Sequence, residues 1–192
     1  MASSINDDEG SEPSCTIDEV HDILTADTGG LVLLPSNAYD EVYKDVYIGE
    51  ESIARNHGEL KCIGITHIMN AALGRGPYCV RTGPSLYKNL GIEFIGFEAI
   101  DATAFDLSQY FYEAADFIEN ALRENGKLLV HCREGVSRSA TLVIAFLMIK
   151  RRVQIRDAVR LVRRGREIYP NDGFVEQLCK LNDQLRKNGH FG

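Results

Sequence analysis

The segment 127–149 constrains the fold more than any other part of this 192-residue chain. A short, mostly apolar run at 127–130 (KLLV) leads into a polar corner at 131–138 (HCREGVSR), and an unbroken apolar run follows at 142–149 (LVIAFLMI). The first run suits a buried strand, and the second, apolar on every side, is typical of a core helix. A strand that turns directly into a buried helix predicts a sheet with helices packed against it.

The rest of the chain predicts strands that alternate with helices. Strands are expected at 42–48, 66–72, 93–100 and 127–130, and the Gly- and Pro-containing stretch 73–85 is expected to be a loop. Helices are expected at 16–24 (opened by a capping box), 52–63, from 106 to the Asn-Gly pair at 125–126, from 139 onward, at 155–168 and at 174–185. This alternation predicts an α/β fold with a mainly parallel central sheet of about five strands flanked by helices.

Length and composition predict one domain, 15–188, between a disordered acidic lead, 1–14, and a short tail, 189–192. The lead resembles neither a signal peptide nor a transit peptide, and the run 142–149 is too short to span a bilayer. Five cysteines (15, 62, 79, 132 and 179) form no Cys-x-x-Cys pair, which argues against a disulfide framework and a zinc module. We therefore expect a cytoplasmic or nuclear protein without membrane contact.

Charge is distributed unevenly along the chain. The net charge of −7 argues against nucleic acid as the main partner. Residues 1–60 hold 14 acidic and 2 basic side chains, whereas 121–192 hold 7 acidic and 15 basic ones. The basic part surrounds Cys132 in sequence. A positive cleft for an anionic substrate and a solvated arginine-rich helix face both agree with this pattern.

The corner 131–138 has the composition of an anion-binding loop that carries a nucleophile. Backbone amides at a helix N-terminus can converge on a phosphate, and Gly135 permits the tight backbone that this requires. The planar guanidinium of Arg138 fits two phosphate oxygens. The same positive field favours the thiolate of Cys132, and a thiolate beneath a phosphate is placed to attack phosphorus.

Other side chains of the corner predict supporting roles. Ser139 is placed to hydrogen-bond the sulfur and to ease its departure in a second step. Ser137 is expected to brace the loop, and His131 to shape the loop rather than to shuttle protons. Metal and cofactor are not required by this chemistry.

A phosphate ester also needs an acid that protonates its leaving oxygen. Asp101 follows the strand predicted at 93–100 and should emerge at the same sheet edge as Cys132. Asp106 is the alternative, although its position favours capping the next helix.

These residues resemble a known family. The run from His131 to Ser139 fits the H-C-x-x-G-x-x-R-S loop of cysteine-dependent protein phosphatases, and the upstream acid Asp101 fits their dual-specificity branch. The likeness is greatest to the small atypical enzymes of the vaccinia-H1-related type, and it extends over about 16–187. It implies Cys132 as nucleophile, Arg138 as phosphate binder, Asp101 as general acid and Ser139 as assistant in hydrolysis.

The resemblance also implies roles for residues outside this catalytic set. Arg166 stands where such enzymes hold a second phosphate, on the helix expected at 155–168, although a solvated helix end is the plainer interpretation. Asn171 stands where they support the active-site loops, although it also fits an ordinary turn. Val136 replaces a tyrosine that lines the phosphotyrosine slot. The remaining substrate-facing positions of the loop are Arg133, Glu134 (without a clear task), Gly135 and Ser137.

The hypothesis is therefore a protein phosphatase acting on phosphotyrosine and phosphoserine or phosphothreonine through a cysteinyl-phosphate. Phosphoproteins are the expected partners; MAP kinases are a family expectation, and a homodimer stays open. The alternatives are the same chemistry on an RNA 5′-triphosphate or a lipid phosphate, and a phospho-binding scaffold with little turnover.

Overall fold

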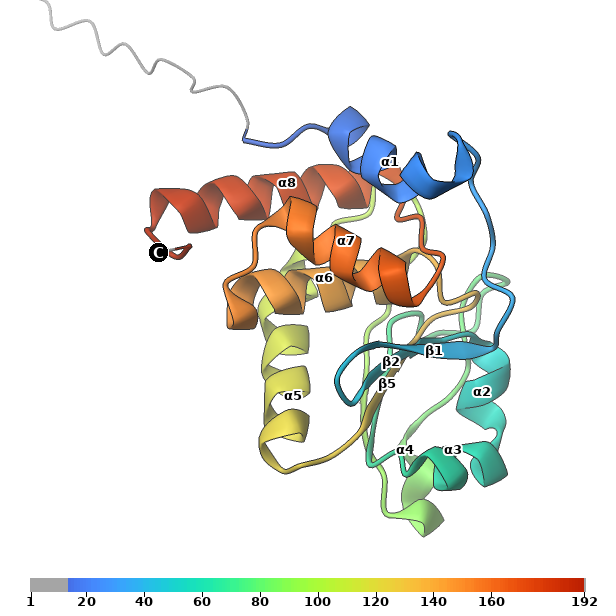
Figure 1. Ribbon diagram of the computed structural model, residues 1–192. Coiled ribbons are helices and arrows are strands. Elements are labelled where there is room, and N and C mark those ends of the chain that lie inside the picture. Colours follow the sequence, from blue (N-terminus) through green and yellow to red (C-terminus); the bar gives the residue numbers. More distant parts are fainter. Residues whose placement is uncertain (1–13, 192) are drawn as a thin grey trace, which may run out of the picture.

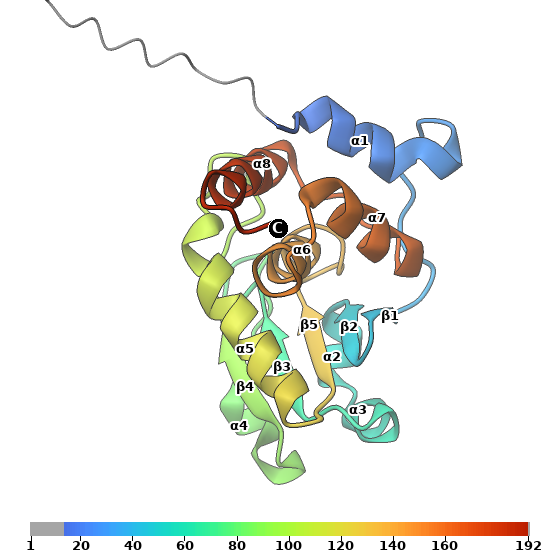
Figure 2. The same ribbon diagram turned by 60° about the vertical axis from the view of Figure 1, so that its left-hand side comes forward.

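A computed structural model describes residues 14–191 and contains a five-stranded sheet with helices on both faces (Figures 1 and 2). The strands, β1 (Tyr39–Tyr43), β2 (Val46–Gly49), β3 (His67–Asn70), β4 (Glu93–Gly96) and β5 (Leu128–His131), lie in the order β1-β2-β5-β3-β4. Only β1 runs antiparallel to its neighbour among these strands. The predicted α/β class, with a mainly parallel sheet of about five strands, is confirmed.

Period-two alternation in the central strands divides the core into two layers. Leu128 and Val130 of β5 pack with α1 (Ile17–Thr25), α5 (Phe111–Arg123), α6 (Arg138–Arg151), α7 (Ile155–Gly165) and α8 (Asp172–Lys187). Leu129, between them, packs on the opposite face with α2 (Glu51–Arg55), α3 (His57–Ile63) and α4 (Pro84–Tyr87). Both faces of the sheet are thus covered, as a parallel sheet requires.

The buried helix predicted after the polar corner is α6. Every residue from Arg138 to Ile149 in it is buried, and α5, α7 and α8 pack around it. A helix enclosed in this way needs no polar face, which explains the unbroken apolar run 142–149.

Several predicted boundaries were wrong. The strand predicted at 42–48 is the hairpin β1–β2, which turns at Asp45 with a φ of 61°. The helix predicted at 52–63 breaks at Asn56, whose side chain caps α3 by accepting from the Glu59 amide at 3.1 Å. The helix predicted from 106 begins as a 3-10 turn, η3 (Ser108–Tyr110), before α5. The helix predicted at 155–168 ends at Gly165.

The ends of the described chain pack against the domain. The capping box of α1 is present as predicted, with Thr16 and Glu19 each bonding the other's backbone amide. Ser14 accepts a hydrogen bond from Asn182 at 2.7 Å, and the predicted lead 1–14 otherwise lies outside the described residues. In the predicted tail 189–192, the His190 ring bonds the Ile149 carbonyl at 2.9 Å, so its described part belongs to the folded domain. No helix within 14–191 combines the length and apolarity that crossing a bilayer demands.

Candidate active site

The corner predicted to bind an anion connects the carboxyl end of β5 to the first turn of α6. Its backbone carbonyls are bonded to the surrounding protein: those of Arg133, Gly135 and Val136 accept from the Glu51 amide, the Arg166 Nε and the Tyr169 amide at 2.8–3.0 Å. Its amides at 133–138 donate to no other group within residues 14–191. With carbonyls turned outward and amides left free, the loop has the polarity of an anion-binding nest.

Gly135 is required by the loop for two reasons. Its φ of +66° is strained for any side chain. A Cβ at this position would also lie 2.6 Å from the carbonyl carbon and oxygen of Gly49, at the end of β2. The loop therefore packs against β2 more closely than any other residue would allow.

Cys132 lies at the base of this loop, 2% exposed. Its Sγ is 3.3 Å from the Oγ of Ser139, a buried residue of the first turn of α6. The predicted contact between the hydroxyl and the sulfur is therefore present. A hydroxyl at this distance can donate to a thiolate and stabilise it as a leaving group.

Arg138 is also buried, and its guanidinium joins the loop to the segment that follows β4. Its Nη1 donates to the Ala99 carbonyl at 3.0 Å, and its Nε lies 3.4 Å from Asp101 Oδ2. Nε makes no hydrogen bond to any residue in 14–191. The guanidinium thus retains donor capacity beside the free amides.

Asp101 is held at the rim of the site by two donors. Its Oδ1 accepts from Ser137 Oγ at 2.9 Å and from Asn171 Nδ2 at 2.8 Å. Asn171 is at the same time the N-cap of α8, since its Oδ1 accepts from the Phe174 amide at 3.1 Å. Both supporting residues therefore fix the direction of the carboxylate that was predicted to be the acid.

Asp106, the alternative acid, makes only local bonds in this structure. Its carboxylate accepts from the amide and hydroxyl of Ser108, at the start of η3. The N-cap of η3 is Leu107, without a side-chain cap bond, so Asp106 braces the turn before η3 and the helix cap expected from it is not formed. The geometry favours Asp101 as the carboxylate of the site.

His131 is fully buried at the end of β5. Its Nδ1 donates to the Cys132 carbonyl at 3.2 Å, and burial lowers its pKa to about 4. The ring is therefore neutral at neutral pH and braces the backbone beside the sulfur, in agreement with the shaping role expected for it.

Arg166 differs most from its sequence-based prediction. Its guanidinium is buried and donates to the Gly135 carbonyl (2.8 Å), the Glu134 carbonyl (3.3 Å), the Asn37 carbonyl (3.0 Å) and Asp40 Oδ2 (2.7 Å). The cause is the end of α7 at Gly165, after which the extended backbone of Arg166 turns its side chain inward. The plainer expectation of a solvated helix end is therefore wrong. That Arg166 holds a second phosphate stays a prediction, and its guanidinium is already bonded to four protein acceptors.

The side chains of Arg133 and Glu134 leave the loop toward solvent. The guanidinium of Arg133 donates to the Pro77 carbonyl at 2.7 Å, and the Glu134 side chain is 70% exposed. Val136 is half-buried. Of these three side chains, only that of Val136 is not exposed to solvent.

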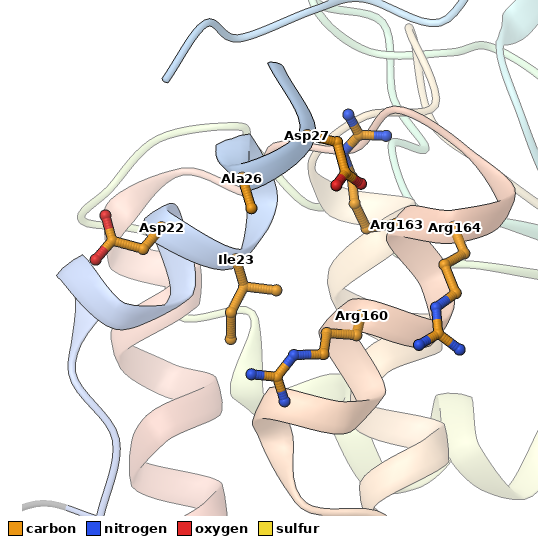
Figure 3. A pocket seen from close by; sticks show the side chains of 7 residues that line it. All are labelled: Asp22, Ile23, Ala26, Asp27, Arg160, Arg163 and Arg164. Carbon is orange, nitrogen blue, oxygen red and sulfur yellow. The ribbon is translucent and has the colours of Figure 1, made fainter. Parts of the chain in front are cut away.

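The basic region predicted around Cys132 is divided in space. Arg138 and Arg166 are buried at the loop, whereas Arg160, Arg163 and Arg164 line a separate cavity of about 370 Å³ between α7 and the end of α1 (Figure 3). The same cavity is lined from the α1 side by Asp22 and by Asp27 of η1 (Ala26–Thr28), so it is of mixed charge.

The residues that sequence reasoning missed are those that hold Arg166. Asp40 and the Asn37 carbonyl lie 126 and 129 positions away from it in the chain. An acidic residue in a short edge strand has no local pattern that marks it as a partner of a residue so distant in the sequence.

Together, the free amides, buried sulfur, guanidinium and carboxylate define the site of a cysteine-dependent phosphatase. Residues 46–184 match the family model described as "Dual specificity phosphatase, catalytic domain". The chain is 47% identical over 152 residues to dual specificity protein phosphatase 26 of Bos taurus and 46% to that of Homo sapiens, covering 79% of this chain and 70% of each relative. The chain belongs to the dual specificity phosphatase family, and it is a protein phosphatase.

Solved structures agree with this assignment. The chain superposes on human DUSP28 with a TM-score of 0.68 at 27% identity, covering 80% of this chain and 99% of that one. A mouse putative dual specificity phosphatase complexed with zinc tungstate gives a TM-score of 0.68 at 28% identity, with coverage of 80% and 91%.

Proposed function

We propose that this phosphatase acts in two steps, with Cys132 as nucleophile and Asp101 as the proton donor and acceptor. The observation that carries the proposal is the position of Cys132 Sγ, at the base of the free amides and 3.3 Å from Ser139 Oγ. A phosphate placed over the sulfur would be bound by those amides and by the unused donors of Arg138.

In the first step the thiolate of Cys132 attacks phosphorus, the ester P–O bond breaks, and Asp101 gives its proton to the leaving oxygen. In the second step Asp101 takes a proton from water, whose oxygen attacks phosphorus as the P–S bond breaks. Ser139 donates to the departing sulfur. The products are the free hydroxyl, inorganic phosphate and the regenerated thiolate.

The choice of substrate is proposed to depend on the side chain at position 136. Val136 is smaller than a tyrosine, which supports a pocket that is more open above the loop. We propose that phosphotyrosine is preferred, and that phosphoserine and phosphothreonine are less disfavoured than in a tyrosine-lined pocket. We further propose MAP kinases as substrates and the cytoplasm or nucleus as the location; the support is the family likeness and the five free cysteines.

The two-step scheme is tested by trapping the phosphoenzyme. Protein mixed with a radiolabelled nitrophenyl phosphate and quenched in acid should carry label, and Ser139→Ala should accumulate more because sulfur leaves more slowly. Cys132→Ser is the control and should carry none. Equal label in Ser139→Ala and the native protein would remove Ser139 from the second step, and label in Cys132→Ser would exclude Cys132 as nucleophile.

The substrate proposal is tested by capture with the double variant Cys132→Ser, Asp101→Ala. It should retain a doubly phosphorylated MAP kinase and release it on addition of vanadate, which competes for the loop. The same kinase without phosphate is the control. Retention of both forms alike would contradict recognition through the phosphate.

A further inference from the structure

A second cluster of chemically active side chains lies at the edge of the sheet opposite Cys132. His67 and Glu93 are the first residues of the parallel strands β3 and β4 and are paired in register, and Glu124 is the C-cap of α5. Cys132 follows the carboxyl end of β5, so the cluster lies at the other end of the strands, where α5 connects to β5 (Figure 2). The phosphatase mechanism uses none of the three.

The three side chains direct their ligand atoms at one point. Nε2 of His67 is 3.6 Å from Glu93 Oε2 and 3.8 Å from Glu124 Oε2, and the candidate ligand atoms all lie within 4.8 Å of one another. Tetrahedral zinc with bonds of about 2.0–2.2 Å separates its ligand atoms by roughly 3.3 Å. Both glutamates are about two-thirds exposed, so small rotations of their side chains can close the difference.

His67 is the fixed member of the cluster. Its side chain is only 7% exposed, and its ring forms a T-shaped contact with the ring of Phe117, with 5.6 Å between ring centroids. Nδ1 lies 2.8 Å from Thr66 Oγ1, whose hydroxyl can donate to the Lys127 carbonyl at 3.2 Å. When it does so, Nδ1 carries the ring proton and Nε2 turns its lone pair to the carboxylates.

The buried imidazole of His67 faces two carboxylates, and a cation between the three groups would balance the charge of the carboxylates. Within the described range 14–191, the nearest charged partners of Nε2 are Glu93 and Glu124, both beyond hydrogen-bond distance, whereas the hydrogen bond of the ring is made by Nδ1. Arg123 lines the same cavity of about 290 Å³, but its Nε bonds Glu119 at 3.2 Å rather than either ligand carboxylate. The cavity leaves room for water on the open side of the cluster.

We propose that His67, Glu93 and Glu124 bind a divalent transition-metal ion, with zinc as the best fit. One imidazole nitrogen and two carboxylate oxygens are ligands that zinc accepts, and water would complete the coordination. The ligands come from β3, β4 and the end of α5, which are far apart in the sequence. The ion would therefore stabilise the fold and take no part in phosphate hydrolysis.

The test uses zinc and the full chain carrying Cys132→Ser, which removes the catalytic thiolate as a competing zinc ligand. Calorimetric titration should show one zinc ion bound. At a free zinc concentration about 100 times the dissociation constant, the melting temperature should rise by roughly 5–10 °C.

Glu124→Gln and Glu93→Gln in the same background should weaken zinc binding at least tenfold and abolish the rise in melting temperature. Glu113→Gln, an exposed change of the same kind on α5, is the matched control and should alter neither. Cobalt should bind in place of zinc without sulfur-to-metal charge-transfer absorption.

Three outcomes would overturn the proposal. Zinc that does not raise the melting temperature would leave the cluster as a contact between His67 and two glutamates, without a metal. Equal binding by Glu124→Gln and Glu113→Gln would place the ion elsewhere. A sulfur-to-cobalt band would assign the ion to one of the remaining cysteines.

Discussion

Replacing Arg166 by alanine tests whether this residue supports the catalytic loop or binds substrate. The change deletes four hydrogen bonds of a buried guanidinium, to three carbonyls and to Asp40, whose side chain is only 19% exposed. Breaking a buried ion pair on one side costs about 3–5 kcal/mol. In a domain of this size, each kcal/mol lost from the free energy of unfolding lowers the melting temperature by roughly 2–4 °C. The melting temperature of Arg166→Ala should therefore fall by about 10 °C.

Activity should fall for the same reason, and without regard to the substrate. The Gly135 and Glu134 carbonyls lose their donors, so the loop amides no longer hold their direction. We expect kcat/KM to fall at least tenfold, about 1.4 kcal/mol, on two peptides of one sequence, one phosphorylated once and the other twice. Arg164→Ala, an exposed arginine two positions earlier, is the control and should leave stability unchanged.

The comparison of the two peptides decides whether Arg166 supports the loop or binds the second phosphate of the substrate. Measured below the melting temperature of the variant, the losses should agree within a factor of two. A loss on the doubly phosphorylated peptide that exceeds the other by tenfold would mean that Arg166 contacts the second phosphate, and the loop-supporting argument would fail.

Further outcomes are expected at the site. Cys132→Ser should retain phosphate binding but lose turnover, and residual activity above about one part in a thousand would count against the nucleophile. Asp101→Ala should lower the rate on the order of 10²–10³-fold for the phosphate ester of a phenol resembling tyrosine, but far less for that of a nitrated phenol. Equal losses on the two esters would mean that another residue is the general acid. Activity should survive chelators, because no step requires a metal, whereas chelators should lower the melting temperature if the His67 cluster holds zinc. His131 has a pKa of about 4 in the folded protein, below its ordinary value of about 6.5. Its contribution to the free energy of unfolding is therefore fully present above about pH 6.5 and is lost as the pH falls toward about 4. Urea unfolding should show about 2 kcal/mol less stability at pH 5 than at pH 7, a difference that should largely vanish in His131→Gln.

Local pattern was sufficient to predict the strand, loop and helix around Cys132. β5 and α6 are buried on all sides, so their apolar runs carry the whole signal, and the residues that identify the loop between them lie within eight positions of one another. Asp101 was also predictable, because the ends of parallel strands meet at one edge.

Features that depend on distant contacts were not predictable in the same way. The hairpin turn at Asp45 has a positive φ without a glycine, and the sequence predicted one continuous strand at 42–48 in its place. The inward turn of Arg166 depends on Asp40 and on the end of α7 at Gly165, where a Cβ would lie 2.8 Å from the Glu41 carbonyl. Neither cause is visible within a window of sequence around residue 166.

The bonds of Arg166 and Asn171 also bear on when activity can arise as the chain is made. The catalytic loop is complete in sequence at residue 138, but its carbonyls are held from residue 166, which is anchored at 37–40, and its acid is held from residue 171. A ribosome releases the chain from its N-terminus, so a nascent chain exposes Cys132 well before these partners. Closing such distant contacts is slow compared with forming helices. Phosphatase activity should therefore appear only when synthesis has passed the start of α8. A shorter nascent chain that already contains Cys132 should be inactive.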